Sequence, residues 1–293
     1  AANCAAFLER YPLATPLIAA TATVPALSGG NPGLRNERAE SWTLGAVLEP
    51  RALPGLTLSA DWLDIRITDP IARLSVNEIA QGCFDNADFN AADPARGNAF
   101  CALIQRDAAG QVIANSASPA VTTGFVNGKR IHMRGLQAAL SYETALDGIG
   151  LAGSFGMAAD LFHLSRRIVD LTGVAPARSD GLVGDPRWEG QIRLRYANRD
   201  WGLRAHVRFT GKQAIARNRG GRAPAGRGDL DHFTASATAD LSLFVNAGAG
   251  SRMVFAVTNL FDRVGQRYFG EIVPLSINDS LGRRMSVALE TRW

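Results

Sequence analysis

The feature that most constrains the fold is an alternation of apolar and polar residues with a period of two. From Trp188 to Tyr196 the even positions are apolar, aromatic or glycine, and the odd positions are polar or charged. The same alternation resumes at Trp201 and continues to Thr210, after a short polar turn at residues 197–200. Because successive side chains of a strand point to opposite faces, this segment predicts an antiparallel hairpin with one apolar face.

The alternation recurs along the chain and predicts an all-β protein of about nine antiparallel strands. Besides the hairpin, the expected strands are 41–49, 56–68, 136–144, 151–160, 233–243, 253–257 and 285–293. The connections alternate between short ones, at 50–55, 145–150, 197–200 and 246–251, and long ones, at 69–135, 161–187, 211–231 and 259–281. Short periplasmic turns and long extracellular loops are typical of a transmembrane β-barrel of the outer membrane.

The polar phase of the strands favours a wide barrel over a small dry core. It carries charged residues that need water or a partner, namely Arg193, Arg195, Arg204, Arg208, Arg284 and Glu290. Tryptophans fall on the apolar phase, as expected for an interfacial aromatic girdle. A soluble β-sandwich also alternates, but its connections need not alternate in length. Nine strands cannot close a single-chain bacterial barrel, which has an even number, so further strands are expected upstream.

The three cysteines indicate an oxidising compartment. Cys83 and Cys101 bracket a polar, loop-like stretch without the ligand spacing of a zinc site. We expect them to form a loop disulfide, although three unpaired buried thiols remain the alternative. Cys4 is then left without a partner. The first residues, Ala1-Ala2-Asn3-Cys4, contain no signal peptide, so the chain is expected to be an internal piece of a longer protein.

Four segments resemble one family, the TonB-dependent receptors. Residues 31–45, Asn-Pro-Gly-Leu-Arg-Asn-Glu-Arg-Ala-Glu-Ser-Trp-Thr-Leu-Gly, resemble the family's entry into a late barrel strand, with Asn36 where proline is common. Residues 58–67 look like the following strand, and residues 257–263, Val-Thr-Asn-Leu-Phe-Asp-Arg, resemble the family's Asn-Leu-Phe-Asp segment. The end of the chain, 289–293, is similar to the closing strand. The four motifs stand in the family's order from Asn31 to Trp293.

The resemblance implies a partial barrel, the last nine of 22 strands. Residues 1–39 are then expected to be an extracellular loop region with the end of an upstream barrel segment, and residues 40–293 the carboxy-terminal strands. The family's plug domain and TonB box are then expected to lie outside this chain. The resemblance also implies a bacterial outer-membrane location, energy from the TonB-ExbB-ExbD complex through the missing amino-terminal region, and recognition of the terminal Trp293 by the barrel assembly machinery.

Candidate ligand-binding residues are the arginines of the predicted lumen and of one long loop. The lumen candidates are Arg193, Arg195, Arg204 and Arg208, which could guide an anionic substrate. The loop candidates are Arg217, Arg219, Arg222 and Arg227, which could meet an anionic ligand or lipopolysaccharide phosphate. For both sets the simpler interpretation is hydrated or paired surface charge. No Ser/His/Asp grouping, metal motif or phosphate-binding loop occurs, so we expect no enzyme activity, cofactor or bound metal.

The leading functional hypothesis is a receptor that actively takes up a scarce ligand such as an iron-siderophore complex, cobalamin or a glycan. A passive outer-membrane channel, an autotransporter translocator and a soluble β-sandwich binding module are the alternatives. The net charge of +4 arises from 31 basic and 27 acidic residues. Such a mixture does not indicate a nucleic-acid partner, and outer-membrane lipid and lipopolysaccharide are the expected surroundings.

Overall fold

The computed structural model describes residues 2–11, 26–90, 92–93, 97–107, 112, 120–214, 232–248, 250–264 and 281–291. The chain divides into two compact units. The first, the loop unit, comprises residues 1–41, 65–132 and 168–178, and the second, the sheet unit, comprises residues 42–64, 133–167 and 179–293. Among the described residues, no helix is long and apolar enough to cross a membrane.

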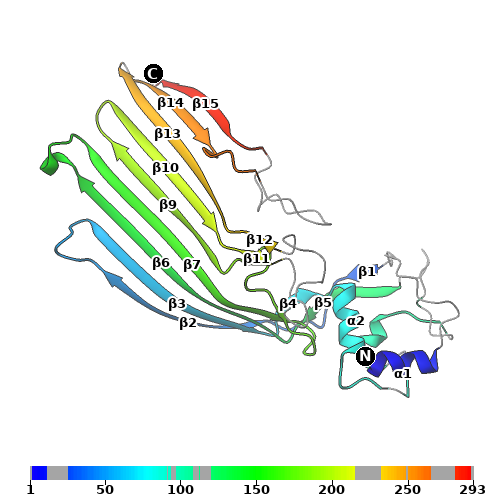
Figure 1. The fold of residues 1–293 in the computed structure, drawn as a ribbon. Helices are drawn as coiled ribbons and strands as arrows, with labels where there is room; N and C mark the ends of the chain where they lie inside the picture. The colour runs from blue at the N-terminus through cyan, green and yellow to red at the C-terminus, as the bar shows by residue number, and fades with distance from the viewer. Residues whose placement is uncertain are drawn as a thin grey trace. The chain divides into compact units, whose positions relative to one another are not determined.

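The main sheet contains nine strands in the order β15-β14-β13-β10-β9-β7-β6-β3-β2 (Figure 1). The short β8 pairs with β7 at the side of this sheet. Their bounds are β2 Arg38–Leu48, β3 Leu56–Thr68, β6 Arg130–Ala145, β7 Ser154–Asp170, β8 Ala177–Arg178, β9 Trp188–Ala197, β10 Trp201–Thr210, β13 Ser236–Gly248, β14 Ser251–Thr258 and β15 Arg284–Thr291. Each of the nine lies beside the next in sequence, so the sheet is an up-and-down meander. It is open, with β2 and β15 at its edges, which confirms the prediction of a partial barrel.

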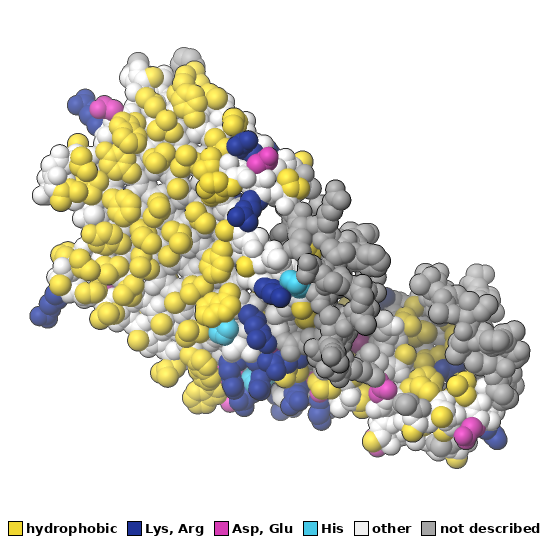
Figure 2. Space-filling view, in the orientation of Figure 1, with side chains coloured by type: hydrophobic (Ala, Val, Ile, Leu, Met, Phe, Trp, Pro, Cys, Tyr) yellow, Lys and Arg dark blue, Asp and Glu magenta, His cyan; other side chains and the backbone are white. Residues whose placement is uncertain are grey.

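The registers confirm that polar and apolar residues lie on opposite faces. On one face β10 and β9 pair Leu203 with Tyr196, Ala205 with Leu194 and Val207 with Ile192. On the other face they pair Arg204 with Arg195, His206 with Arg193 and Arg208 with Gln191. We call the first the outer face and the second the inner face. Figure 2 shows the sheet covered by hydrophobic side chains on one side.

The outer apolar side chains contact one another along the sheet but stay partly exposed. Trp201 is 39% exposed and Leu203 is 36% exposed, and Ile192 and Met253 are exposed to a similar extent. An apolar surface of this extent is unusual in a water-soluble monomer. It suits a face that meets lipid.

The outer face changes character toward the long loops. Along β6 toward the long loop, the outer face is apolar as far as Leu136. The next residue on this face, Arg134, binds the buried carboxylate of Asp64 on β3. On β7 it is apolar up to Leu161, and the next outward position, His163, stacks on Trp188 with 4.1 Å between the ring centroids. The strands therefore continue beyond the apolar band. This is why β6 and β7 are longer than the predicted 136–144 and 151–160.

The short turns are tied to neighbouring strands. In the turn before β3, Gly55 has φ +85°, and a Cβ there would lie 2.1 Å from the carbonyl oxygen of Glu143. Between β9 and β10, the Asn198 side chain accepts the Trp201 N–H at 2.8 Å. The Tyr196 hydroxyl donates to the carbonyl of Ala152 at 2.8 Å. These bonds fix the strand register at the end where the connections are short.

The long connection between β10 and β13 contains a small two-stranded sheet. It pairs β11, Gln213–Ala214, with β12, His232–Phe233. Phe233 therefore belongs to this sheet, and β13 begins at Ser236 instead of at the predicted 233. The Gln213 side chain accepts the Gly184 N–H at 2.9 Å, which links the connection before β9 to the connection after β10.

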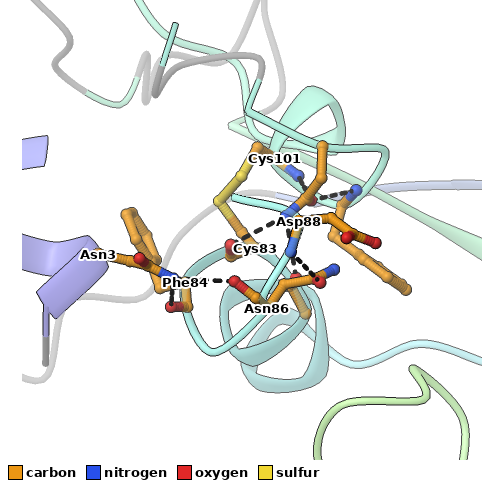
Figure 3. The surroundings of a disulfide bond; sticks show 9 residues. Asn3, Cys83, Phe84, Asn86, Asp88 and Cys101 are labelled. Carbon is orange, nitrogen blue, oxygen red and sulfur yellow. Dashed lines mark hydrogen bonds between the residues drawn. A yellow bond between two sulfur atoms is a disulfide. The ribbon is translucent and has the colours of Figure 1, made fainter. Parts of the chain in front are cut away.

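The loop unit has a small core of its own. Its sheet contains β1 Ala26–Gly29, β5 Val121–Asn127 and β4 Ile71–Arg73, with β1 parallel and β4 antiparallel to the central β5. Helix α2, Val76–Phe84, and the short 3-10 helix η2, Cys101–Leu103, complete it. The buried core residues are Leu74, Ile79, Cys83, Cys101, Ile104, Ala120 and Val121. A disulfide joins Cys83 to Cys101 within this core (Figure 3).

Helix α1, Ala2–Arg10, packs on the end of α2. The Asn3 side chain donates to the carbonyls of Phe84 and Asn86, each at 2.9 Å (Figure 3). Phe7 packs edge-on against Phe84, and the Arg106 guanidinium lies 4.6 Å from the Phe7 ring centroid. Burial lowers the pKa of Arg106 from its ordinary value, while the neighbouring Tyr11 acts in the opposite direction. Cys4 on this helix is an exposed free thiol.

The segment that carries the first family-like motif is held against β4 and β5. The Asn31 side chain donates to the Phe125 carbonyl at 3.0 Å. The Asn127 side chain accepts the Arg35 N–H at 2.8 Å and donates to the carbonyls of Arg35 and Asp69. The Glu37 carboxylate accepts the Ile71 N–H at 3.1 Å. The polar residues of this motif thus serve as anchors between loop segments.

Replacing Ser75 by alanine is expected to loosen α2. Ser75 caps the helix by accepting the Glu78 N–H at 3.2 Å, and the Glu78 carboxylate accepts the Ser75 N–H at 2.7 Å. Loss of such a cap costs about 1 kcal/mol. Hydrogen exchange of the α2 amides should therefore accelerate about fivefold, as that free energy requires. Ser28→Ala in β1 is the control, and equal protection in both variants would contradict the role of the cap.

Candidate functional site

The inner face of β6, β7, β9, β10 and β13 is the candidate functional site. Two shallow cavities lie along it among the described residues. The first has a volume of about 420 Å³, and its lining combines the apolar residues Leu161, Phe162 and Phe209 with the polar residues Gln137, Asp160, Glu189, Gln191, Arg208 and Thr210. The second has a volume of about 360 Å³ and is lined by Ser141, Glu143, Arg193, Arg195, Arg204 and His206 among others.

A hydrogen-bonded network links β7, β9 and β10 between the two cavities. Asp160 accepts hydrogen bonds from Arg193 at 2.8 Å and from Gln191 at 3.2 Å. Gln191 in turn lies 2.9 Å from Nε2 of His206 through its side-chain oxygen. Asp160 thus neutralises Arg193 and orients the amide that meets His206. Because Arg193 and His206 are register partners across the strands, the network also reinforces the hairpin.

Arg208 is held by a different carboxylate, which also reaches the end of β14. One oxygen of Asp240 accepts from the Arg208 guanidinium at 2.8 Å, and the other accepts the Asn259 N–H at 2.9 Å. Asn259 is buried and has φ +55°, a left-handed conformation that asparagine tolerates better than most residues. Its side chain exchanges two 2.9 Å hydrogen bonds with the backbone of Arg263. Asn259 of the Asn-Leu-Phe-Asp segment therefore shapes the turn after β14.

The other two arginines lie nearer the short turns. Arg195 is 3.5 Å from the Glu143 carboxylate, and both side chains are exposed, so this ion pair is weak. Arg204 has no carboxylate partner among the described residues, and its guanidinium lies 5.8 Å from the centroid of the Phe244 ring. Arg252 lies 4.5 Å from the same centroid. A Cβ at Gly202 would approach this ring to 2.4 Å, so glycine is required for Phe244 to lie there.

The structure brings together part of the predicted residue set. Arg193, Arg195 and Arg204 line one cavity, whereas Arg208 lines the other. The loop candidates Arg217, Arg219, Arg222 and Arg227 lie outside the described residues, as does the proposed assembly residue Trp293. Within the described part of the chain, no group of three or more histidine, cysteine or acidic side chains is placed to hold a metal ion.

The sequence reasoning missed the acidic partners Glu143, Asp160 and Asp240. All three stand on the polar phase of predicted strands, which was a usable signal. Their pairing depends on register, since Asp160 is 33 residues from Arg193 in sequence and Asp240 is 32 residues from Arg208. Register across long connections is not encoded in the local alternation.

Comparison with known proteins places these observations in a family context. A family described as "TonB dependent receptor-like, beta-barrel" matches residues 7–260. A search of curated proteins finds no match.

Solved structures share the fold at low sequence identity. The siderophore receptor PirA of Acinetobacter baumannii has a TM-score of 0.55 at 14% identity, over 89% of this chain and 32% of its own. The ferric enterobactin receptor PfeA of Pseudomonas aeruginosa has a TM-score of 0.53 at 17% identity, over 89% and 32%. The iron transporter FrpB of Neisseria meningitidis has a TM-score of 0.52 at 12% identity, over 90% and 32%. The chain thus spans about a third of the length of each.

Proposed function

Because the chain belongs to the TonB-dependent receptor β-barrel family, we propose that it forms part of the wall of a receptor that actively takes up a scarce ligand. Members of this family are receptors and transporters of the bacterial outer membrane and not enzymes. The chain is accordingly an outer-membrane protein. The activity, ligand and partners of the whole protein are proposals, because this chain covers only about a third of its structural relatives.

The observation that carries the proposal is the contrast between the two faces of the sheet. The outer face is apolar and exposed, as lipid contact requires. The inner face has charged residues in an ordered network, with Arg193 on Asp160 and Arg208 on Asp240. A hydrated, polar wall of this kind suits the passage of a polar ligand. An iron chelate is the leading ligand class, since the relatives include a siderophore receptor and an iron transporter; cobalamin and a glycan remain further candidates.

The remaining parts of the proposal follow from family membership. Residues 1–39 would belong to the extracellular side and residues 40–293 to the carboxy-terminal barrel strands. Energy would come from the TonB-ExbB-ExbD complex, acting through a plug and TonB box elsewhere in the protein. Trp293 would be read by the barrel assembly machinery. The segment with Arg217, Arg219, Arg222 and Arg227 would meet an anionic ligand or lipopolysaccharide phosphate.

Energy dependence is the test that separates a receptor from a passive channel. Cells producing the complete protein should accumulate iron-55 from one member of a panel of labelled siderophores. Accumulation should fall to the level of cells without the gene after addition of a protonophore or deletion of TonB, while binding to the cell surface persists. Accumulation that is insensitive to both treatments would indicate a passive channel. Uptake of labelled cobalamin or a glycan instead would retain the receptor and change its ligand.

A further inference from the structure

The pairing of β10 with β13 is not specified by the alternation of their residues. The two strands are joined by the long connection 211–235, so no tight turn aligns them. On the outer face their register partners are all apolar, from Trp201 with Val245 at one end to Phe209 with Ala237 at the other. A slip of two residues in either direction would again pair apolar with apolar residues, because the side-chain period of a strand is two. The outer face therefore tolerates three registers.

The charged residues of the inner face do not select one register either. Asp240 is the register partner of His206, and its carboxylate reaches Arg208, two positions along β10, at 2.8 Å. A slip of two residues would place Asp240 directly opposite Arg208 in one direction and opposite Arg204 in the other. Opposite charges at facing positions are favourable. Electrostatic interactions therefore tolerate both shifted registers.

The contact between Gly202 and Phe244 does discriminate among the registers. These residues are register partners on the inner face. The ring occupies the space of a side chain at residue 202, since a Cβ there would lie 2.4 Å from Cε1 and Cζ of the ring. Gly202 is the only glycine of β10. In one shifted register the ring would face Arg204, and in the other it would face Asp200, beyond the end of the strand. The ring thus fits against β10 in one register only.

Two guanidinium groups hold the ring in this place. Arg252 on β14 lies 4.5 Å from the ring centroid, and its Nε donates to the Asn246 side chain at 3.0 Å. Arg204 lies 5.8 Å from the same centroid. Such contacts stabilise the ring where it lies. Asn246 also donates to the carbonyl of Arg199 at 2.6 Å, but neighbouring residues offer equivalent carbonyls, so this bond does not identify a register.

We propose that Phe244 and Gly202 form a register lock, which selects the pairing of β10 with β13 when the barrel assembles, with Arg204 and Arg252 holding the ring. The lock joins adjacent interior strands of the sheet, so it does not depend on the rest of the barrel. A slip of two residues would move β13, β14 and β15 together by about 7 Å relative to the strands before them. The correct inner wall therefore depends on the lock.

The hairpin of β9 and β10 contains the same kind of contact without needing it to set the register. Gly190 and Phe209 are register partners, and a Cβ at Gly190 would lie 2.6 Å from the Phe209 ring. The turn between the strands is short, and Asn198 fixes it by accepting the Trp201 N–H. Such a turn sets the register of a hairpin by itself. Replacing Gly190 should strain the hairpin without shifting it, which makes it the matched control for Gly202.

Disulfide cross-linking at the other end of the strands reports the register. Thr210 and Ser236 are register partners on the inner face, and cysteines at these positions can form a disulfide only in the native register. Cysteines at Thr210 and Thr238 report a slip in one direction, and cysteines at Thr210 and Thr234 report a slip in the other. The complete protein also carries Cys4→Ser, which removes the exposed free thiol. Outer-membrane fractions are oxidised, and only protein with heat-modifiable migration is scored.

Gly202→Ala and Phe244→Ala are each expected to lower the ratio of native to shifted cross-links about fivefold, the size of a cross-strand aromatic contact. Gly190→Ala should leave the ratio unchanged. An unchanged ratio in either lock variant, or an equal fall in Gly190→Ala, would overturn the proposal.

Moving the glycine is the sharper test. In the double variant Gly202→Ala with Arg204→Gly, the space for the ring lies two positions further along β10. Phe244 should then pair with residue 204, and the cross-link between positions 210 and 238 should predominate. General destabilisation would not favour one shifted register over the other. Retention of the cross-link between positions 210 and 236 would contradict the lock. Because the cross-links are scored without ligand or energy source, the lock and the proposed uptake can fail independently.

Discussion

Replacing Cys83 and Cys101 together by alanine is expected to destabilise the loop unit by about 3 kcal/mol, the usual contribution of a disulfide that closes a loop of this size. The two cysteines are 18 residues apart and fully buried. In the described part of the loop unit they belong to a core of seven buried residues, so the disulfide is a large share of what holds this core together. A core this small depends on covalent cross-links.

Limited proteolysis of the complete protein in outer-membrane vesicles measures this effect. Cleavage within residues 69–129 should become faster in the double variant, while cleavage of the sheet unit should stay slow. Cys4→Ala is the control, because this thiol is exposed and unpaired. Reduction of the unmodified protein by dithiothreitol after mild unfolding should give the same pattern. Equal protection of the double variant would mean that the disulfide does not maintain the unit.

Replacing Ile192 by arginine is expected to destabilise the barrel by about 2–4 kcal/mol, the cost of an arginine on the lipid face near the middle of the bilayer. Ile192 lies at the centre of the outer alternation of β9, four residues from both Trp188 and Tyr196. Its register partner on β10 is Val207. The substitution would place a cation in the apolar band with no carboxylate beside it.

The neighbouring substitution Gln191→Arg provides the control. Gln191 lies on the inner face, and its amide already donates to Asp160 at 3.2 Å, so an arginine there finds water and a carboxylate. The folded fraction of the complete protein is measured by urea titration in lipid vesicles, with heat-modifiable migration as readout. If both variants unfold at the same urea concentration, the assignment of outer and inner faces is wrong.

The strands were predictable because their signal is local. Each of the nine is encoded by alternation within its own segment, and the hairpin of β9 and β10 agrees with the prediction to within a residue. The ends of β6 and β7 nearest the long loops, residues 130–135 and 161–170, were not predicted, because the outer face becomes polar there, at Arg134 and His163. The period of two continues through these positions. What changes is that the outer face is no longer apolar, because these residues lie beyond the apolar band.

The loop unit was not predictable from the same signal. Its core combines residues from Leu74 to Val121, which come together through a disulfide and a parallel pair of strands. One local sign was present, since Ser75 and Glu78 have the spacing of a capping box before α2. The ion pairs of the inner face were likewise hidden, because each joins different strands. For that reason, the sequence identified the candidate arginines but not which of them pair with a carboxylate among the described residues.

The Asp240 carboxylate accepts two hydrogen bonds at once, from Arg208 on β10 and from the backbone N–H of Asn259 at the end of β14. The carboxylate cannot be lost without leaving a guanidinium and a buried turn each short of an acceptor. The residues at these three positions are therefore expected to covary among homologues. In homologous sequences, a neutral residue at position 240 should coincide with loss of the arginine at 208 and with a redesigned turn at 259.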